Sequence, residues 1–254
     1  MTTTAVRLAP DALIGRRDPI TSLKVKLFAD GADRAEMLEM YSSHCIQGFT
    51  TNPTLMRKAG VRDYEAFARD ILACIPDRPI SLEVFADDFQ EMERQARKIA
   101  SWGHNVFVKI PITNTRGESS IPLVRRLSQD GIRVNVTALM TLQQVFSVCT
   151  VVERMASAYI SVFAGRIADT GRDPLPIMSA AVEMLKCTPG VELIWASPRE
   201  LLNVSQADSV GCHIITASRD IINKLSLLSR DLSEYSLETV RMFHTDARAS
   251  GFEI

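Results

Sequence analysis

Short apolar runs alternate with longer stretches of helical periodicity along most of this chain. The apolar runs are rich in Val, Ile and Phe, as buried strands are, and Gly and Pro punctuate many of the boundaries between them and the periodic stretches. Strands are predicted at 23–30, 46–51, 80–85, 105–111, 132–137, 158–164, 191–197 and 211–216. Helices are predicted at about 31–41, 63–74, 88–102, 117–130, 142–155, 175–186, 199–206, 218–229 and 236–249.

The order of these elements predicts a single α/β domain. Each predicted strand is followed by a helix, and eight such units over about 230 residues fit a closed (β/α)8 TIM barrel. An open doubly wound sheet is the alternative, which eight evenly spaced units fit less well. We expect an N-terminal arm at 1–22 and a barrel domain at 23–254 that includes extra C-terminal helices. The connections at Asn52-Pro53 and 165–173 are predicted to be a turn and a loop.

The composition excludes several classes of partner. The chain has a net charge of −1 and no long basic or acidic block, so we expect neither a nucleic acid nor a membrane surface as partner. No apolar run reaches the roughly 18 residues of a membrane span, and the first residues lack a signal-like apolar segment, so a cytoplasmic protein is expected. Five scattered cysteines and four histidines show no ligand spacing, so no metal site is predicted.

One lysine, Lys109, lies inside the apolar run 105–111, near the carboxyl end of a predicted strand. Lysine is rarely buried without a partner, and desolvation disfavours its ammonium form, which makes the amine available as a nucleophile. The alternative is a lysine that extends to solvent or pairs with a structural carboxylate. The residues at the other strand ends are needed to choose between these interpretations.

The carboxyl ends of barrel strands meet on one face, where catalytic residues of this fold gather. Nearly all the predicted strands place polar residues at or near that end: Asp30, Asn52, Glu83, Lys109, Asn135, Thr137, Ser161, Ser197 and Arg199. Some of them could be structural, because barrel interiors also hold hydrogen-bonded Asn, Thr and Ser. A lysine with two carboxylates favours Schiff-base chemistry, with Glu83 and Asp30 moving protons and Asn135 and Asn52 holding sugar hydroxyls.

Two arginines near these strand ends are suited to a phosphate. Arg166 follows the sixth predicted strand, and Arg199 opens the helix predicted after the seventh. Guanidinium groups and helix N-terminal amides bind anions, and phosphate sites recur in this region of barrels. The alternative for either arginine is a surface ion pair with a nearby carboxylate such as Asp169.

Together, these motifs resemble those of the transaldolase family, in particular the short transaldolases akin to fructose-6-phosphate aldolase. The resemblance runs from about residue 23 to the C-terminus, where the segment 234–243 is also similar. The motifs that carry it are Phe28-Ala-Asp30, Thr50-Thr-Asn-Pro-Thr54, Leu82-Glu-Val84, Val108-Lys-Ile-Pro111, Asn135-Val-Thr137 and Ser161-Val-Phe-Ala-Gly-Arg-Ile-Ala-Asp169.

The resemblance implies a role for each candidate residue. Lys109 would be the Schiff-base lysine, Glu83 the acid/base that acts with a bound water, and Asp30 the residue that serves cleavage. By the same resemblance, Asn135 and Thr137 would position the intermediate and the water. Arg166, Ser197 and Arg199 would bind the phosphate, and Ser161 and Asn52 would bind the sugar end near the carbonyl.

The resemblance also implies the reaction. Transaldolases of the pentose phosphate pathway move a dihydroxyacetone unit from a ketose phosphate, fructose 6-phosphate or sedoheptulose 7-phosphate, to an aldose phosphate, without metal or organic cofactor. Members that transfer have Glu and Phe where the aldolases tend to have Gln and Tyr, and Glu83 and Phe163 favour transfer. Pro198 departs from the family pattern, in which an aromatic residue or a lysine is more usual.

Alternatives concern catalysis, substrate and assembly. A non-catalytic phosphosugar-binding barrel would keep Arg166 and Arg199 but would have no use for Lys109 beside Glu83. Aldol cleavage of fructose 6-phosphate, or a modified ketose from a polysaccharide or secondary-metabolite pathway, would keep the chemistry. A homo-oligomer is expected from apolar positions in the last two helices, and the resemblance to the short members implies a ring of five or ten chains before a dimer. These positions are Ile221, Ile222, Leu225, Leu228, Leu237, Val240, Met242 and Phe243.

Overall fold

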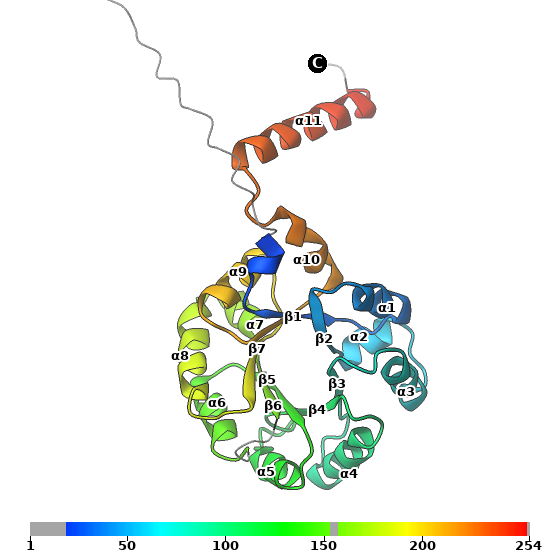
Figure 1. Ribbon diagram of the computed structural model, residues 1–254, viewed down its shortest axis with the longest axis vertical. Helices are drawn as coiled ribbons and strands as arrows, with labels where there is room; N and C mark the ends of the chain where they lie inside the picture. Colours follow the sequence, from blue (N-terminus) through cyan, green and yellow to red (C-terminus); the bar gives the residue numbers. More distant parts are fainter. Residues whose placement is uncertain (1–18, 153–156, 253–254) are drawn as a thin grey trace, which may run out of the picture. The chain divides into compact units, whose positions relative to one another are not determined.

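The computed structural model describes residues 19–152 and 157–252 (Figure 1). Contacts divide the described chain into two units: a barrel unit, Lys24–Ser226, and a second unit made of the residues before and after it. In the barrel unit eight parallel strands form a closed ring in sequence order, β1 pairing with β8, with helices outside the ring (Figure 1). The predicted (β/α)8 TIM barrel with extra C-terminal helices is confirmed.

The eight strands coincide with the eight predicted apolar runs to within a few residues. They are β1 (Lys26–Asp30), β2 (Ile46–Thr50), β3 (Ile80–Glu83), β4 (Val106–Pro111), β5 (Val134–Leu139), β6 (Ala158–Val162), β7 (Val191–Trp195) and β8 (Ile214–Ala217). Most of their residues are buried, as expected for strands covered by helices on one face and by the barrel interior on the other.

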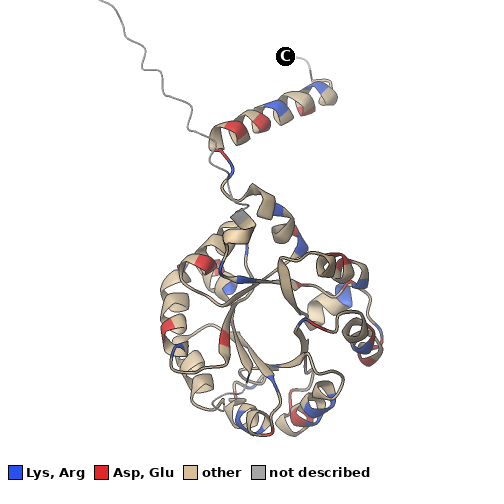
Figure 2. Ribbon diagram, in the orientation of Figure 1, with Lys and Arg blue, Asp and Glu red and all other residues tan. Residues whose placement is uncertain are grey.

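Several of the helices between the strands are amphipathic, and several begin at a side-chain cap. Asp33, Asp63 and Asp88 accept backbone N–H groups at the start of α1, α3 and α4. Figure 2 shows both signs of charge interspersed along the outer helices, for example on α4. The helices are α1 (Arg34–Ser42), α3 (Tyr64–Cys74), α4 (Phe89–Ala100), α5 (Ile121–Gln129), α6 (Leu142–Cys149), α8 (Leu175–Leu185), α9 (Leu202–Ser209) and α10 (Arg219–Asn223), which η2 (Lys224–Leu227) continues.

Two short helices were wrongly predicted to be a turn and a loop. Asn52-Pro53 is a helix start: Asn52 caps α2 (Pro53–Lys58) by accepting Leu55 N–H at 3.0 Å, and Pro53 is the first helical residue. The predicted loop 165–173 contains most of α7 (Ala164–Asp169). Both helices have six residues, too few for the hydrophobic periodicity by which longer helices are predicted.

Two predicted helix boundaries were also wrong. Helix α9 begins at Leu202, so Arg199 precedes it in a loop and does not open it. Helix α6 ends at Cys149, before the predicted boundary at Met155, a residue that lies outside the described residues.

The barrel interior is layered along the strands. Its amino-terminal part is an apolar plug in which Phe107 and Tyr159 stack at 3.9 Å between ring centroids. Gly48 makes room for this plug, because a Cβ there would lie 2.5 Å from the Phe28 ring. Side chains two residues apart on a strand share a face, so the next inward residues form a layer above the plug. The pairs of plug and upper residues are Phe28 and Asp30, Phe107 and Lys109, Tyr159 and Ser161, and Ile214 and Thr216.

The second unit contains η1 (Pro19–Ser22) and the long helix α11 (Leu232–Ser250). Asp231 caps α11, which ends at Gly251 with a φ of 67°, and none of its residues is buried. By contrast, Ile221 and Leu225 of the barrel unit are 6% and 4% exposed, so these two of the apolar positions listed for an oligomer are already buried within the chain. No described helix is long and apolar enough to cross a membrane.

Candidate active site

The site is built around an ion pair between neighbouring strands. Glu83 of β3 and Lys109 of β4 are register partners, and Lys109 Nζ lies 2.9 Å from Glu83 Oε2. The two side chains are only 8% and 15% exposed. Lys109 Nζ also donates to the carbonyl of Thr51 at 2.8 Å. The lysine is therefore held in place by two acceptors, in a position where its charge is poorly hydrated.

Asp30, the last residue of β1, supplies a second carboxylate in the layer of inward-facing side chains that also holds Lys109. Thr50 Oγ1 donates to Asp30 Oδ1 at 2.7 Å, and the hydroxyls of Thr50 and Thr216 lie 2.6 Å apart. Burial raises the pKa of Asp30, and the opposing effect of the Lys109 charge is smaller. A carboxyl with a raised pKa is suited to exchange a proton near neutral pH.

A hydrogen-bonded chain of side chains runs past the lysine strand, from β3 through β5 to β6. Asn135, the register partner of Lys109 on β5, donates from Nδ2 to Ser81 Oγ at 3.0 Å and accepts from Ser161 Oγ at 2.7 Å. Asn135 is fully buried by these contacts. Thr137 differs from them, because its Oγ1 is buried without a hydrogen-bond partner among the described residues. A buried hydroxyl of this kind is a natural contact for a substrate or water oxygen.

A cavity of about 370 Å³ opens over these groups at the carboxyl ends of the strands. It is large enough for a sugar phosphate and is lined by nine of the predicted site residues: Asp30, Asn52, Glu83, Lys109, Thr137, Ser161, Phe163, Arg166 and Ser197. The Oδ1 of Asn52 is occupied as the cap of α2, so its amide NH₂ is the group left for a ligand. Asn135 lies beneath the cavity, and Arg199 is not among its lining residues.

The two arginines have different surroundings. Arg166 lines the cavity, with its guanidinium 5.7 Å from the centre of the Phe163 ring. Arg199 donates from Nε and Nη2 to the carboxylate of Asp169, at 3.0 and 2.5 Å. The alternative that the sequence left open, an ion pair with Asp169, is thus what Arg199 makes in this structure. Ser197, which lines the cavity two residues before Arg199, has a positive φ of 57°.

Several contributors to the site had not been predicted. Thr50, Thr216 and Ser81 complete the polar layer, and the two-residue repeat above the apolar plug would have indicated Thr216. Tyr64 of α3 donates to the Glu83 carbonyl at 3.0 Å, and its ring packs 4.6 Å from that of Phe85. Its burial raises the hydroxyl's pKa and keeps it a donor.

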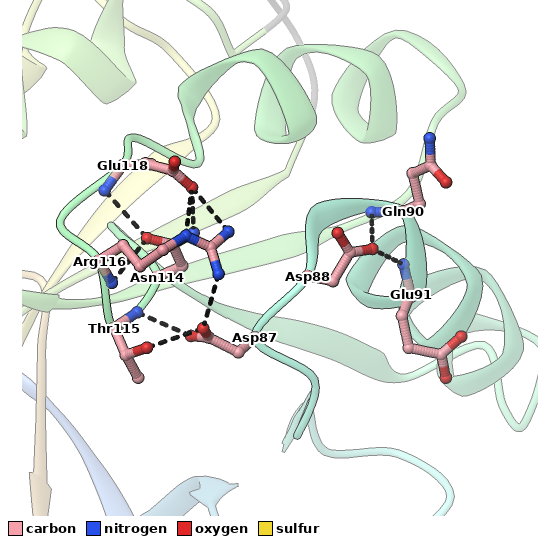
Figure 3. Close-up of polar contacts among 8 residues, drawn as sticks. All are labelled: Asp87, Asp88, Gln90, Glu91, Asn114, Thr115, Arg116 and Glu118. Carbon is pink, nitrogen blue, oxygen red and sulfur yellow. Dashed lines mark hydrogen bonds and ion pairs between the residues drawn. The ribbon is translucent and has the colours of Figure 1, made fainter.

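Polar contacts also join the loops that follow the lysine and glutamate strands (Figure 3). Asp87, after β3, accepts from the backbone N–H and the hydroxyl of Thr115, both at 2.7 Å. Arg116 lies 3.6 Å from the same carboxylate, and Asn114 binds Glu118 within the loop after β4 (Figure 3). The two loops beside Lys109 and Glu83 are therefore held together at the rim of the barrel.

A comparison with known proteins decides the family. The family model described as transaldolase/fructose-6-phosphate aldolase matches residues 27–254, nearly the whole chain. This chain belongs to the transaldolase/fructose-6-phosphate aldolase family. Among its relatives, a probable transaldolase of Thermoanaerobacter sp. (strain X514) is 33% identical over 91% of this chain and 100% of its own length. A probable transaldolase of Dehalococcoides mccartyi is 32% identical over 79% of this chain and 90% of its own length.

Solved structures with the same fold are more distant. Dihydrodipicolinate synthase from Rhodopseudomonas palustris matches 88% of this chain and 79% of its own, with a TM-score of 0.58 and 13% identity. KGPDC from Streptococcus mutans matches 78% of this chain and 89% of its own, with a TM-score of 0.53 and 14% identity. Identities this low establish the barrel fold of the family member and nothing about its substrate.

Among the described residues, no group of three or more His, Cys, Asp and Glu side chains is arranged to hold a metal ion. The cavity of this family member is instead lined by a lysine, two carboxylates, hydroxyls and an arginine. These groups can form a covalent adduct with a carbonyl, move protons and bind an anion.

Proposed function

We propose that the protein is a Schiff-base transaldolase that moves a dihydroxyacetone unit from a ketose phosphate to an aldose phosphate. The observation that carries this proposal is the buried pair of Lys109 and Glu83 at 2.9 Å on the wall of a cavity of sugar-phosphate size. A structural ion pair would leave no reason for a second carboxylate and an unpartnered hydroxyl in the same cavity.

In the first half of the reaction Lys109 becomes the nucleophile. Its ammonium passes a proton to Glu83, the neutral amine adds to the ketose C2 carbonyl, and Glu83 returns the proton to the carbonyl oxygen. Glu83 then takes a second proton from the nitrogen of the carbinolamine and delivers it to the hydroxyl, which leaves as water, and a protonated imine remains. Thr137 is suited to hold the departing water, because its buried Oγ1 has no other hydrogen-bond partner among the described residues.

Asp30 serves the cleavage step. Its carboxylate removes the proton of the C4 hydroxyl, the C3–C4 bond breaks, and its electron pair moves into the imine to give an enamine on Lys109. The aldose phosphate formed from C4 onward leaves. A new aldose phosphate then enters, the enamine carbon attacks its aldehyde, and Asp30 returns the proton to the oxygen that forms. Hydrolysis of the imine releases the product.

The wall of the cavity supports transfer over simple cleavage. Phe163 lines the cavity and packs against the apolar plug, and its ring offers no proton to the enamine. Release of free dihydroxyacetone requires that proton. An enzyme with Phe163 and a carboxylate at Glu83 therefore keeps the three-carbon unit until an aldehyde arrives.

The phosphate of either substrate would lie toward Arg166 and Ser197. Arg166 is the arginine of the cavity lining, and it follows β6, two strands beyond the lysine strand β4 around the ring. This arrangement separates the anionic end of the substrate from Glu83 and Asp30, whose carboxylates would repel it. Metals and organic cofactors have no role in the proposed reaction.

The test is an acceptor-dependent assay. With fructose 6-phosphate alone the protein should turn over slowly, and addition of erythrose 4-phosphate should give sedoheptulose 7-phosphate and glyceraldehyde 3-phosphate in equal amounts. Rapid formation of free dihydroxyacetone without an acceptor would contradict transfer and favour aldol cleavage. No reaction with these sugars but reaction with a modified ketose would retain the chemistry and change the substrate.

We also propose that the protein is a homo-oligomer. The α11 helix has no buried residue, and Leu237, Val240, Met242 and Phe243 along it are 48–61% exposed. A helix with such apolar positions is stabilised by burial against another surface. Light scattering should give a mass several times the 28.2 kDa of one chain, and a monomer at micromolar concentration would contradict this proposal.

A further inference from the structure

We propose that Tyr64 is a positioning residue for Glu83, which fixes the main chain at the end of β3 so that the Glu83 carboxylate stays in contact with Lys109. The proposal rests on the proposed function, because it concerns the proton transfers assigned to Glu83. Tyr64 lies on α3, outside the ring of strands, and is not among the residues that line the active-site cavity (Figure 1). Its effect on catalysis would therefore pass through the main chain of Glu83.

The backbone hydrogen bonds between β2 and β3 stop one step before Glu83. The Thr51 N–H donates to the Ser81 carbonyl at 3.1 Å. In a parallel pair such bonds recur at every second residue, so the next donor would be the N–H of residue 53 and the next acceptor the Glu83 carbonyl. Residue 53 is Pro53, which has no N–H and begins α2. At this position β2 thus has no N–H to offer the Glu83 carbonyl.

The Tyr64 hydroxyl supplies the donor that the proline lacks. It donates to the Glu83 carbonyl at 3.0 Å. A buried carbonyl without a hydrogen bond costs free energy, so this contact satisfies a group that the strand pairing leaves open. Burial first, and then the nearby charge of Glu83, raise the pKa of the hydroxyl, so that it stays a donor well above neutral pH.

Tyr64 is itself held by a helix cap and by two aromatic rings. It is the first residue of α3, and the Asp63 side chain caps that helix. Its ring lies 4.6 Å from the Phe85 ring and meets the Trp102 ring edge-on at 5.4 Å, measured between ring centroids. A phenol packed in this way has little freedom to move its hydroxyl. The contact therefore defines where the Glu83 carbonyl lies.

A second side chain holds the main chain just beyond Glu83. The two N–H groups that follow Val84 both donate to Gln95 Oε1 of α4, at 2.8 and 3.1 Å. Between these tethers, the Val84 N–H donates to the Lys109 carbonyl at 3.2 Å. The end of β3 is thus fixed by side chains of α3 and α4 as well as by the lysine strand. The Glu83 carboxylate on this segment lies 2.9 Å from Lys109 Nζ.

A hydroxyl that only stabilises the fold predicts a different result from one that positions Glu83. Loss of a purely structural hydroxyl would lower the activity of every variant by the same factor. A hydroxyl that acts through Glu83 affects the rate only while Glu83 has a proton to move. The comparison that separates them is Tyr64→Phe in the unmodified protein and in Glu83→Gln.

Steady-state transfer from fructose 6-phosphate to erythrose 4-phosphate makes this comparison. Tyr64→Phe alone should lower kcat about fivefold, the value of one hydrogen bond, and leave KM for both sugars within about twofold. In Glu83→Gln the same substitution should change kcat by less than about twofold, whereas any fall in Tm should be the same in both backgrounds. An unchanged kcat in Tyr64→Phe, or a fivefold loss that persists in Glu83→Gln, would overturn the proposal.

Tyr41→Phe is the matched control for removal of a phenol hydroxyl. Tyr41 lies on α1 and also makes one hydrogen bond with its hydroxyl, to Asp77 at 2.7 Å. It does not line the cavity, so this variant should keep the kcat and KM of the unmodified protein. A loss of kcat equal to that of Tyr64→Phe would remove the special role of Tyr64.

Hydrogen exchange separates this proposal from the proposed function, because it needs no substrate. The N–H groups of Val84 and of the next two residues should exchange several-fold faster in Tyr64→Phe than in Tyr41→Phe, since one tether of this segment is gone. Transfer by the unmodified protein, with unchanged exchange and kcat in Tyr64→Phe, would overturn the positioning role alone. Absence of transfer together with the faster exchange would overturn the transaldolase assignment and retain Tyr64 as the tether of the strand end.

Discussion

Two lysine–glutamate pairs on the described barrel strands have similar geometry and different surroundings. Lys26 and Glu192 lie 2.7 Å apart near the amino ends of the strands, and Lys109 and Glu83 lie 2.9 Å apart near their carboxyl ends. The first pair is 44% and 27% exposed, the second 8% and 15%. Contact distance is therefore no support for the reactive role that we propose for Lys109, whereas its burial, a second carboxylate and an adjoining cavity support it.

The largest expected difference between the two pairs is the effect of replacing the lysine. Lys109→Arg keeps a positive charge but removes the amine that can form an imine, so transfer should fall by about 10⁴-fold or more. Lys26→Arg should stay within about twofold of the unmodified protein, because an exposed pair contributes little. Steady-state transfer rates measure both. Equal losses for the two variants would mean that Lys109 is structural.

Replacement of the two glutamates should give a smaller difference in activity between the two pairs. Glu83→Gln can still accept from Lys109 but cannot take up its proton, so kcat should fall by about 10²-fold, the usual contribution of a positioned acid or base. Glu192→Gln is the control. Single-turnover rates of imine formation should report the same loss for Glu83→Gln, and an unchanged rate would remove Glu83 from the proton transfers.

The pH dependence of thermal stability tests the role of Asp30, the second carboxylate near Lys109, which the Lys26 pair lacks. Burial raises the pKa of Asp30, so its ionised form is costly in the folded protein. The sign follows from linkage: a carboxyl whose folded pKa is raised stabilises the fold below its unfolded pKa, and this contribution is lost as pH rises through the folded pKa. Asp30→Asn should therefore raise Tm by a few degrees at pH 7 and have less effect at pH 4.

Catalysis should show the opposite dependence, because cleavage needs the Asp30 carboxylate. In the unmodified protein kcat should fall as pH drops below the raised pKa of Asp30, and this acid limb should be absent from the residual activity of Asp30→Asn. A Tm for Asp30→Asn below that of the unmodified protein at pH 7 would contradict the account of Asp30 as a desolvated carboxylate.

The smallest expected effect is a change of partition at Phe163. In Phe163→Tyr the ring that lines the cavity gains a hydroxyl, and this phenol remains protonated at neutral pH. Release of dihydroxyacetone from fructose 6-phosphate without acceptor should rise about two- to tenfold, the value of one hydrogen bond in the transition state. Combination with Glu83→Gln should increase this fraction further. An unchanged ratio of release to transfer would show that another group controls protonation.

Much of this architecture could be predicted because the signals were local and strong. Eight apolar runs with regular spacing determine a barrel, and Lys109 stands out as a lysine flanked by buried residues on its strand. Because strand ends converge on one face, nine of the predicted residues lie around one cavity.

The features that were not predicted depend mostly on contacts between residues far apart in the sequence, which sequence spacing does not show. Arg199 and Asp169 are 30 residues apart, and nothing local distinguishes an arginine that binds phosphate from one that pairs with a carboxylate. Helices α2 and α7 were too short to show periodicity, although Asn52-Pro53 is a helix-start signal in its own right. The contact of Tyr64 with the Glu83 backbone likewise joins elements 19 residues apart.

The most direct test of the central claim is to trap the proposed imine and locate it. The protein is incubated with fructose 6-phosphate, reduced with borohydride, digested and mapped by mass spectrometry, with Lys26→Arg and Lys109→Arg treated in parallel. Reduced three-carbon and sugar adducts are expected on Lys109 alone, with loss of activity. They should be present in Lys26→Arg and absent in Lys109→Arg. An active protein that carries no adduct, or an adduct on another lysine, would contradict Schiff-base catalysis by Lys109.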